Sequence, residues 1–381
     1  MEDLIYITAM LGPQYVQMTL DDFLFGEFKQ PSERNCGVAT TKTLRSVRVP
    51  PRLLMTVDVE KLTGILSLFN EKYRALREAK RHDLYRTFYI PKKSGGMRKI
   101  DAPNNELMSA LRELKLILET EFHALYHTSA YAYVKQRSTL HAMQKHQKNE
   151  SKWFAKLDLH NFFGSTTLAY VMKMLSVIFP FNMVIQNERG RRELETALSL
   201  AFLDGVLPQG TPISPMLTNL MMIPVDFILT KQLRNFEKQT YVYTRYADDF
   251  TISSRYEFDI SKIEALVKDT LAEFDAPFTV NQKKTRYGSS SGKNWNLGLM
   301  LNKDNEITVG HKRKAQFQSM LHNFIVAQNR GESWEVSEIQ YVLGVYSYIS
   351  SVEPEAAARI VKFVNEKHGN IDVLKLMKSK L

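Results

Sequence analysis

The stretch Tyr241-Val-Tyr-Thr-Arg-Tyr-Ala-Asp-Asp-Phe-Thr-Ile-Ser253 decides how the rest of the chain is interpreted. Apolar and polar residues alternate along it, which is typical of a half-buried β-strand. Two adjacent acids, Asp248 and Asp249, interrupt this pattern. Neighbouring carboxylates in a strand repel each other unless a cation compensates their charge. The stretch therefore predicts strand structure that carries a divalent-metal site.

A third acid ends another predicted strand far upstream. Residues 153–159 also alternate, and Asp158 stands at the end of Lys152-Trp-Phe-Ala-Lys-Leu-Asp158. We expect two strands from distant parts of the chain to bring Asp158 and Asp248 together, giving the oxygen ligands that magnesium prefers. Paired magnesium ions about 3.5–4 Å apart are the usual machinery for phosphoryl transfer onto a nucleic-acid hydroxyl. Taken singly, each Asp also fits a turn or cap residue.

Composition and charge narrow the class of protein. The chain has 381 residues, with 51 Lys and Arg against 41 Asp and Glu, so its net charge of +10 favours a polyanionic partner such as nucleic acid. A disordered or fibrous composition does not fit. The one cysteine, Cys36, excludes an intramolecular disulfide and a thiolate zinc cluster. No apolar run approaches the roughly 18 residues of a membrane helix, so we expect a soluble, cytoplasmic protein with no membrane partner.

Hydrophobic periodicity outlines the remaining elements. Residues 56–85, 105–125 and 212–236 have helical spacing, residues 278–281 and 296–301 resemble strands, and the chain beyond residue 311 is almost wholly helical. Residues 86–103 form two short extended runs around a Ser-Gly-Gly turn, which predicts a basic hairpin. A mixed α+β body followed by a helical tail indicates a catalytic body with a separate carboxy-terminal domain.

Four motifs follow one another along the chain: Asp158 with Phe163 five positions on, Leu207-Pro-Gln-Gly-Thr-Pro-Ile-Ser-Pro215, Tyr246-Ala-Asp-Asp249 and Asn281-Gln-Lys-Lys-Thr285. Their order and rough spacing resemble those of the reverse transcriptases. The chain most resembles the bacterial retron-type branch, from about residue 81 to residue 298. Residues 343–355 look like the thumb of the same branch, and residues 1–75 match no pattern that we can name.

This resemblance implies an α+β right-hand polymerase. Its parts would be a helical amino-terminal extension at residues 1–80, fingers at 81–130, a palm with the catalytic carboxylates at 131–300 and an α-helical thumb at 301–381. By similarity, Asp158 and Asp248 hold two magnesium ions and Asp249 assists as the third catalytic carboxylate. The backbone carbonyl of Leu159 completes one coordination shell.

The resemblance also implies residues that bind the incoming nucleotide. Phe163 looks like a steric gate, an aromatic ring that would clash with a 2′-hydroxyl and so select deoxynucleotides. An ordinary core phenylalanine is the alternative. Gln209 and Gly210 resemble the loop that supports the nascent base pair and template, where glycine permits close backbone approach. The alternative there is a simple helix-initiating turn.

Basic residues complete the nucleotide side of the resemblance. Arg98 and Lys92 or Lys93 resemble the hairpin residues that hold the triphosphate, and the planar fork of arginine suits phosphate. Lys284 looks like the residue that approaches the departing pyrophosphate. Each of these lysines also fits a solvated surface charge.

Two segments depart from typical retron enzymes. Those enzymes carry Val-Thr-Gly where this chain has Asn296-Leu-Gly298, and Asn-Ala-x-x-His where it has His141-Ala-Met-Gln-Lys-His146. Both segments bear on recognition of a retron-style RNA.

The expected function is RNA-directed synthesis of DNA from deoxynucleoside triphosphates with two Mg²⁺ ions. The expected setting is bacterial defence against phage, with a structured non-coding RNA and an effector protein or a second copy of the chain as partners. One alternative is an abortive-infection polymerase that works without a template or from a protein primer. Another is a catalytically idle RNA-binding scaffold, disfavoured because the three carboxylates and the nucleotide-side residues occur together.

Overall fold

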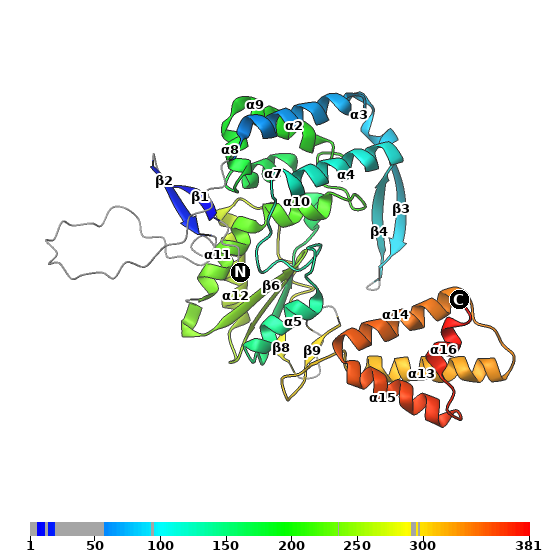
Figure 1. Cartoon of the computed structure of the whole chain (residues 1–381). Coiled ribbons are helices and arrows are strands. Elements are labelled where there is room, and N and C mark those ends of the chain that lie inside the picture. Colours follow the sequence, from blue (N-terminus) through cyan, green and yellow to red (C-terminus); the bar gives the residue numbers. More distant parts are fainter. Residues whose placement is uncertain are drawn as a thin grey trace, which may run out of the picture. The chain divides into compact units, whose positions relative to one another are not determined.

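The structure is a computed structural model, which describes residues 6–11, 14–19, 57–92, 95–234, 236–290, 295 and 298–381. The chain divides into two compact units. Figure 1 labels their helices and strands. Unit 1 comprises residues 1–127, 161–231 and 274–277, and unit 2 comprises residues 128–160, 232–273 and 278–381. The described residues include no helix long and apolar enough to cross a membrane.

Unit 1 is mainly helical and carries two hairpins. Its strands are β1 (Tyr6–Leu11), β2 (Gln14–Thr19), β3 (Tyr85–Pro91) and β4 (Met97–Pro103). Its helices are α2 (Val59–Lys72), α3 (Arg74–Glu78), the short 3-10 helix η1 (Arg81–Leu84), α4 (Asn105–Thr120), α6 (Phe162–Ser165), α7 (Leu168–Leu175), α8 (Phe181–Gln186), α9 (Glu188–Ser199), α10 (Ser214–Met221) and α11 (Ile223–Arg234), whose last residues belong to unit 2.

Helix α4 shows why unit 1 holds together. Asn104 caps its first turn by accepting a hydrogen bond from the Leu107 amide, and four of its leucines recur every three or four residues on one face, namely Leu107, Leu111, Leu114 and Leu118. That face is fully buried, as expected for a helix that packs on one side. The rings of Phe122 and Phe181 stack 4.9 Å apart, which joins the end of α4 to α8.

Unit 2 combines an antiparallel sheet with a helical carboxy-terminal part. Its strands are β5 (Trp153–Asp158), β6 (Tyr241–Tyr246), β7 (Asp249–Ser254), β8 (Arg286–Ser289), β9 (Met300–Leu301) and β10 (Ile307–Thr308). Its helices are α5 (Thr139–Lys148), the 3-10 helix η2 (Phe236–Lys238), α12 (Ile260–Glu273), α13 (His311–Asn329), α14 (Val336–Val352), α15 (Pro354–Lys367) and α16 (Val373–Lys378).

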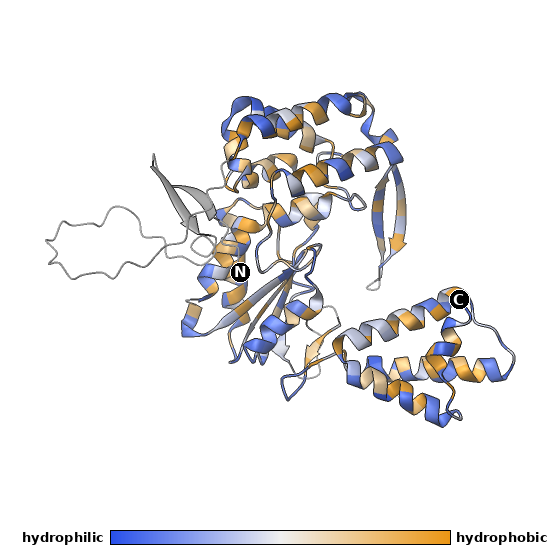
Figure 2. Cartoon of the chain, in the orientation of Figure 1, coloured by the Kyte–Doolittle hydropathy of each residue, from blue (hydrophilic) through white to orange (hydrophobic). Residues whose placement is uncertain are grey.

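The central sheet has four strands in the order β6-β7-β5-β8. Strand β7 pairs with both β6 and β5 in antiparallel register, and Asp158 lies opposite Asp249. Inside unit 2 the sheet shares one hydrophobic core with the terminal helices, because Phe154 of β5 stacks on Trp295 at 5.5 Å and both belong to the cluster that contains Phe317. Hydrophobic and hydrophilic residues interleave along α13–α16, as expected for helices that each bury one side (Figure 2).

The structure confirms several expected elements. The basic hairpin is β3 and β4 with Gly95 and Gly96 at its tip, the strand ending in Asp158 is β5, and α13–α16 are the helical tail. The helix expected at residues 105–125 is α4, which ends five residues earlier, at Thr120.

Other expectations were wrong in detail. Residues 56–85 form α2, α3 and η1, because the chain leaves helical geometry at Tyr73 and again at Ala79. Residues 212–236 form two helices that meet at Met222, not one. The strand expected at residues 278–281 makes only an isolated bridge from Val280 to Leu159. Of the strand expected at residues 296–301, the described residues 298–301 include the two-residue β9, and residues 296 and 297 lie outside the described part of the chain. The amino-terminal extension is mixed rather than only helical, because β1 pairs with β2.

Candidate active site

The two adjacent acids lie at a tight turn between two strands. Residues 241–253, expected to be one strand, are the hairpin β6–β7, in which Tyr246 lies opposite Asp249 and only Ala247 and Asp248 connect the strands. Ala247 has a φ of 57°, a left-handed conformation uncommon for a residue with a side chain. The guanidinium of Arg245, 1% exposed, donates to the Ala247 carbonyl at 3.1 Å. The turn is therefore supported from inside the fold.

The third acid reaches the same place from β5. Asp158 is the last residue of β5 and lies directly opposite Asp249 in the sheet. The next residue, Leu159, donates its backbone amide to the Asp248 carbonyl at 3.1 Å. Backbone pairing thus fixes the relative positions of all three aspartates within unit 2, as the sequence predicted for Asp158 and Asp248.

The electrostatics of Asp248 follow from this grouping. Burial, together with the nearby negative charges of Asp249 and Asp158, raises the pKa of its carboxyl from 3.8 to about 6. Ionising this carboxyl therefore costs more free energy than ionising an exposed aspartate, and a nearby cation lowers that cost. The arrangement is therefore a site that gains from binding positive charge.

Lys284 lies on the same site and pairs with Asp158. Its ammonium is 2.8 Å from one carboxylate oxygen of Asp158 and 3.0 Å from the other. This hydrogen bond to Asp158 is the main cause that raises the pKa of Lys284, with smaller contributions from the charges of Asp158, Asp248 and Asp249. The backbone amide of Asn281 donates to the Asp158 carbonyl at 2.7 Å, so residues 281–285 are tied to the end of β5.

A second lysine pairs with Asp249. The ammonium of Lys156, on β5, is 2.7 Å from Oδ2 of Asp249. The sequence patterns did not single out Lys156. Its position two residues before Asp158 could have indicated it, because alternate residues of a strand share a face.

The donor set fits a divalent cation. Three carboxylates supply the hard oxygen ligands that magnesium prefers, and repulsion among them is relieved by positive charge. In the structure, both oxygens of Asp158 contact Lys284 and one oxygen of Asp249 contacts Lys156. As they stand, no three His, Cys, Asp or Glu side chains of the described residues are grouped closely enough to enclose a metal ion. A cation would therefore replace the ammonium of Lys284 on Asp158.

Unit 1 collects the residues expected on the nucleotide side. The Asp101 amide of β4 donates to the Gln209 carbonyl at 2.8 Å, which ties the basic hairpin to the loop before α10. The same loop also donates a hydrogen bond, from the Leu207 amide to the Thr166 carbonyl at 3.1 Å. Thr166 directly follows α6, the helix that carries Phe163. Three segments distant in sequence are therefore joined by backbone hydrogen bonds.

The individual side chains on these segments differ in exposure. Arg98 and Lys92 are exposed on the hairpin, and Lys93 lies outside the described residues. Phe163 is half-buried, with its ring edge-on to buried Phe162 at 5.7 Å. Gly210 is exposed and has a φ of 125°, so its backbone adopts a conformation that favours glycine.

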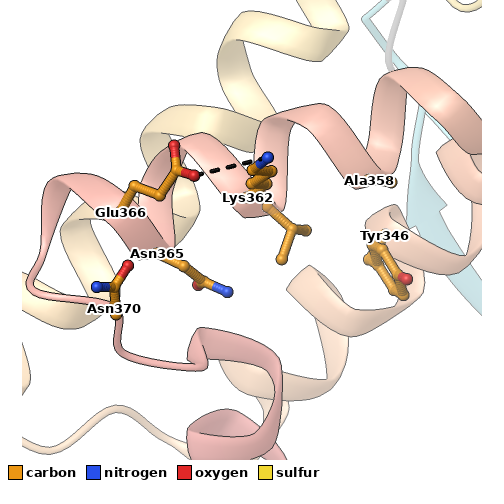
Figure 3. Close-up of a pocket in the computed structure, with 7 residues that line it drawn as sticks. Tyr346, Ala358, Lys362, Asn365, Glu366 and Asn370 are labelled. Atoms are coloured by element: carbon orange, nitrogen blue, oxygen red, sulfur yellow. Dashed lines mark ion pairs between the residues drawn. The ribbon is translucent and has the colours of Figure 1, made fainter.

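The pocket in the helical part of unit 2 lacks the side chains expected of a catalytic site. It has a volume of about 440 Å³ and is lined by Tyr346, Ala358, Val361, Lys362, Asn365, Glu366 and Asn370 (Figure 3). Its one acid, Glu366, faces Lys362 at 3.8 Å. This lining offers no pair of carboxylates for acid–base or metal chemistry.

The fold and the three-aspartate site define a nucleotide-polymerising enzyme of the palm type. Residues 90–332, more than half of the chain, match the family model described as reverse transcriptase (RNA-dependent DNA polymerase). The chain belongs to this family, and it is similar to retron reverse transcriptases.

Retron enzymes are among its relatives. The retron Ec73 reverse transcriptase of Escherichia coli is 26% identical over 295 residues, covering 74% of this chain and 90% of that protein. The retron Ec83 reverse transcriptase of Escherichia coli is 26% identical over 326 residues, covering 82% and 96%. The retron Mx65 reverse transcriptase of Myxococcus xanthus is 29% identical over 295 residues, covering 75% and 65%. A solved telomerase structure from Candida tropicalis aligns over 65% of this chain and 60% of its own, at 14% identity and a TM-score of 0.41.

Proposed function

We propose that this reverse transcriptase copies an RNA template into DNA by two-magnesium phosphoryl transfer, as part of a bacterial defence against phage that uses a dedicated non-coding RNA. The observation that carries the catalytic part is the register of Asp158 against Asp249, with Asp248 at the adjoining turn. This register gathers three carboxylates around one point of the sheet.

The carboxylates have distinct roles in the proposed mechanism. Asp158 and Asp248 would hold two magnesium ions, with the backbone carbonyl of Leu159 as a further oxygen ligand and Asp249 assisting. When bound, the ions stabilise the attacking and leaving oxygens of the phosphoryl transfer. Without the ions, Lys284 balances the negative charge of Asp158. The Lys284 side chain is 57% exposed, so it can move away without repacking of the core. Once displaced, the ammonium of Lys284 approaches the departing pyrophosphate.

The nucleotide side belongs to unit 1 in this proposal. Arg98, with Lys92 or Lys93, holds the triphosphate through charge-assisted hydrogen bonds. Phe163 stands against the sugar and excludes a 2′-hydroxyl. Gln209 and Gly210 support the nascent base pair and template. The hydrogen bond from Asp101 to Gln209 supports this grouping, because it joins the triphosphate hairpin to the template loop.

We assign the parts of the right-hand polymerase as expected from the sequence. Residues 1–80 are the extension, 81–130 the fingers, 131–300 the palm and 301–381 the thumb. The hydrophobic core that Phe154 and Trp295 share with α13–α15 supports a thumb that folds onto the palm sheet within unit 2.

The proposed RNA and defence roles rest on the retron relatives. Three of these relatives are named as retron reverse transcriptases. Sequencing the nucleic acid that copurifies with the protein tests this part. A single recurrent structured RNA, joined to or accompanied by DNA copied from it, is the expected result. Random cellular RNA would contradict the dedicated partner.

A primer-extension assay tests the catalytic part. The full chain receives a defined RNA template, a DNA primer, four deoxynucleotides and Mg²⁺, beside a reaction without nucleic acid and a reaction with Asp248→Asn. We expect product that follows the template sequence and is absent with Asp248→Asn. DNA polymer attached to protein in the reaction without nucleic acid would instead establish the template-independent or protein-primed alternative.

A further inference from the structure

Lys156 is a cation built into the sheet beside the catalytic carboxylates. It lies on β5 two residues before Asp158, so both side chains leave the same face of the sheet. In the register with β7, Lys156 is opposite Thr251, and Asp158 is opposite Asp249. Lys156 is therefore the diagonal neighbour of Asp249, and its Nζ lies 2.7 Å from Oδ2 of that residue.

The burial of this ion pair distinguishes it from the pair that Lys284 makes. The Lys156 side chain is 13% exposed and that of Asp249 is 19% exposed, whereas the Lys284 side chain is 57% exposed. Removing one partner of a poorly solvated ion pair leaves an uncompensated charge, which is strongly destabilising. The Lys156–Asp249 contact should therefore persist while the Lys284–Asp158 contact exchanges with solvent and with cations.

This difference divides the three carboxylates. One oxygen of Asp249 pairs with the ammonium of Lys156, whose side chain is largely shielded from solvent. The Asp158 side chain, 10% exposed, pairs with the exposed Lys284 and accepts a hydrogen bond from the Asn281 side-chain amide at 3.4 Å. No ion pair of Asp248 with Lys, Arg or His exists within 4 Å among the described residues. The site thus has two carboxylates open to exchange and one fixed in place.

We propose that Lys156 is a positioning residue of the polymerase site, a fixed counter-ion that holds Asp249 by one oxygen and leaves Asp158 and Asp248 as the carboxylates that take divalent cations. The inference rests on the proposed metal-dependent function and deepens it. Lys156 reduces the repulsion among three neighbouring acids, and it holds the Asp249 carboxylate in one orientation.

Lys156→Met tests this role, because methionine retains most of the length and packing of the side chain and removes the charge. The matched control is Lys152→Met, the same substitution four residues upstream. Lys152 is exposed, and no carboxylate of the described residues lies within ion-pair distance of it. Lys156→Arg restores a cation at the site.

The readouts are magnesium binding and turnover, measured separately. Binding is followed in the full chain, without nucleic acid, as the Mg²⁺ concentration at the midpoint of the metal-induced rise in melting temperature. We expect Lys156→Met to shift this midpoint at least about threefold lower, since a positive charge has left the site. We expect kcat to fall at least about tenfold, with KM for the deoxynucleotide within about twofold of wild type, because active-site geometry tolerates displacements of only about 0.5 Å. Lys156→Arg should recover both values, and Lys152→Met should change neither.

A midpoint that is unchanged or higher in Lys156→Met would overturn the inference, since it would show that the lysine only supports the fold. If Lys156→Met does not fold, Lys156→Gln keeps a hydrogen-bond donor for Asp249 and removes only the charge, so the same lower midpoint is expected there. Measurements on wild type and Asp248→Asn distinguish a failure of this inference from a failure of the proposed metal site. A wild-type melting temperature that ignores Mg²⁺ would refute the proposed metal site and the inference with it, whereas a response lost only in Asp248→Asn, with Lys156→Met like wild type, would refute the inference alone.

Discussion

The backbone amide of Asp101 donates a hydrogen bond to the carbonyl of Gln209 at 2.8 Å, which fastens strand β4 of the basic hairpin to the loop before α10. The Asp101 side chain is 9% exposed, accepts from the Thr87 hydroxyl at 2.6 Å and pairs with Lys99 at 3.1 Å. The hairpin strand is thus held from its backbone and its side chain. A displacement of this strand would carry Arg98, three residues away, with it.

Gly210→Ala should disturb this connection. A Cβ at Gly210 would lie 2.8 Å from the Asp101 carbonyl oxygen and 2.9 Å from Cγ2 of Ile100, in a conformation with a φ of 125°. A side chain there therefore meets the hairpin backbone. We expect a loss of stability of about 1–3 kcal/mol and a fall in kcat/KM for the deoxynucleotide of at least about tenfold. Thermal melting and single-nucleotide incorporation measure the two effects.

Gly205→Ala is the matched control for this change. Gly205 also has a positive φ, 80°, but nothing lies within 4 Å of the Cβ position. It should lose stability through backbone strain alone and keep its kcat/KM. Equal kinetic losses in both variants would show that collision with the hairpin is not the cause.

Phe163→Ala should weaken discrimination between sugars. If the half-buried ring excludes a 2′-hydroxyl, its removal should raise the incorporation of ribonucleotides relative to deoxynucleotides by at least about tenfold. This factor corresponds to the loss of a steric clash worth about 1.4 kcal/mol in the transition state. Competition between the two nucleotides in a single-addition assay gives the ratio. Phe162→Leu, next to it and buried, should lower stability and leave the ratio unchanged. An unchanged ratio in Phe163→Ala would return Phe163 to a packing role.

RNA binding should weaken steeply with salt. The net charge is +10, and each phosphate that the protein neutralises on a single strand contributes about 0.7 to the slope of log K against log salt concentration. Lys92→Ala and Arg98→Ala should each reduce the slope by about that amount if these exposed side chains contact phosphate. Titration of labelled RNA at four salt concentrations measures the slope. A slope near zero would indicate that RNA is not held through its phosphates.

Sequence patterns located the acids because a pair of carboxylates inside an alternating stretch is conspicuous. They did not show that the stretch is a hairpin, because the turn depends on Ala247 adopting a left-handed φ, which alanine rarely does. Lys152 and Lys156 are the same residue type and stand four positions apart, so the alternation of a strand assigns both to the same face. Only burial and the register against β7 distinguish them, and both depend on long-range pairing. The contact of Asp101 with Gln209 runs through the backbone, so it leaves no trace in side-chain chemistry.

Asp248 should make the stability of the metal-free protein depend on pH. Its folded-state pKa of about 6 lies above the ordinary value of 3.8, so between these pH values the folded state binds more protons than the unfolded state. Stability therefore falls as pH rises from about 4 to about 6 and stays lower above it, by an amount on the order of 3 kcal/mol. Asp248→Asn removes this titration. The melting temperature of the variant should exceed that of wild type by a margin that widens from pH 4.5 to pH 7 in the presence of a chelator.

Magnesium should reverse this margin, because a divalent cation favours the ionised carboxylate and stabilises the wild type alone. Melting curves with Mg²⁺ at pH 7 should therefore raise the wild-type melting temperature and leave that of Asp248→Asn unchanged. Asp249→Asn serves as the contrast, since it deprives the buried Lys156 of its ion-pair partner, and it should lower the melting temperature in chelator where Asp248→Asn raises it. If the margin between wild type and Asp248→Asn is the same at pH 4.5 and pH 7, Asp248 does not titrate in this range and the electrostatic account of the site is wrong.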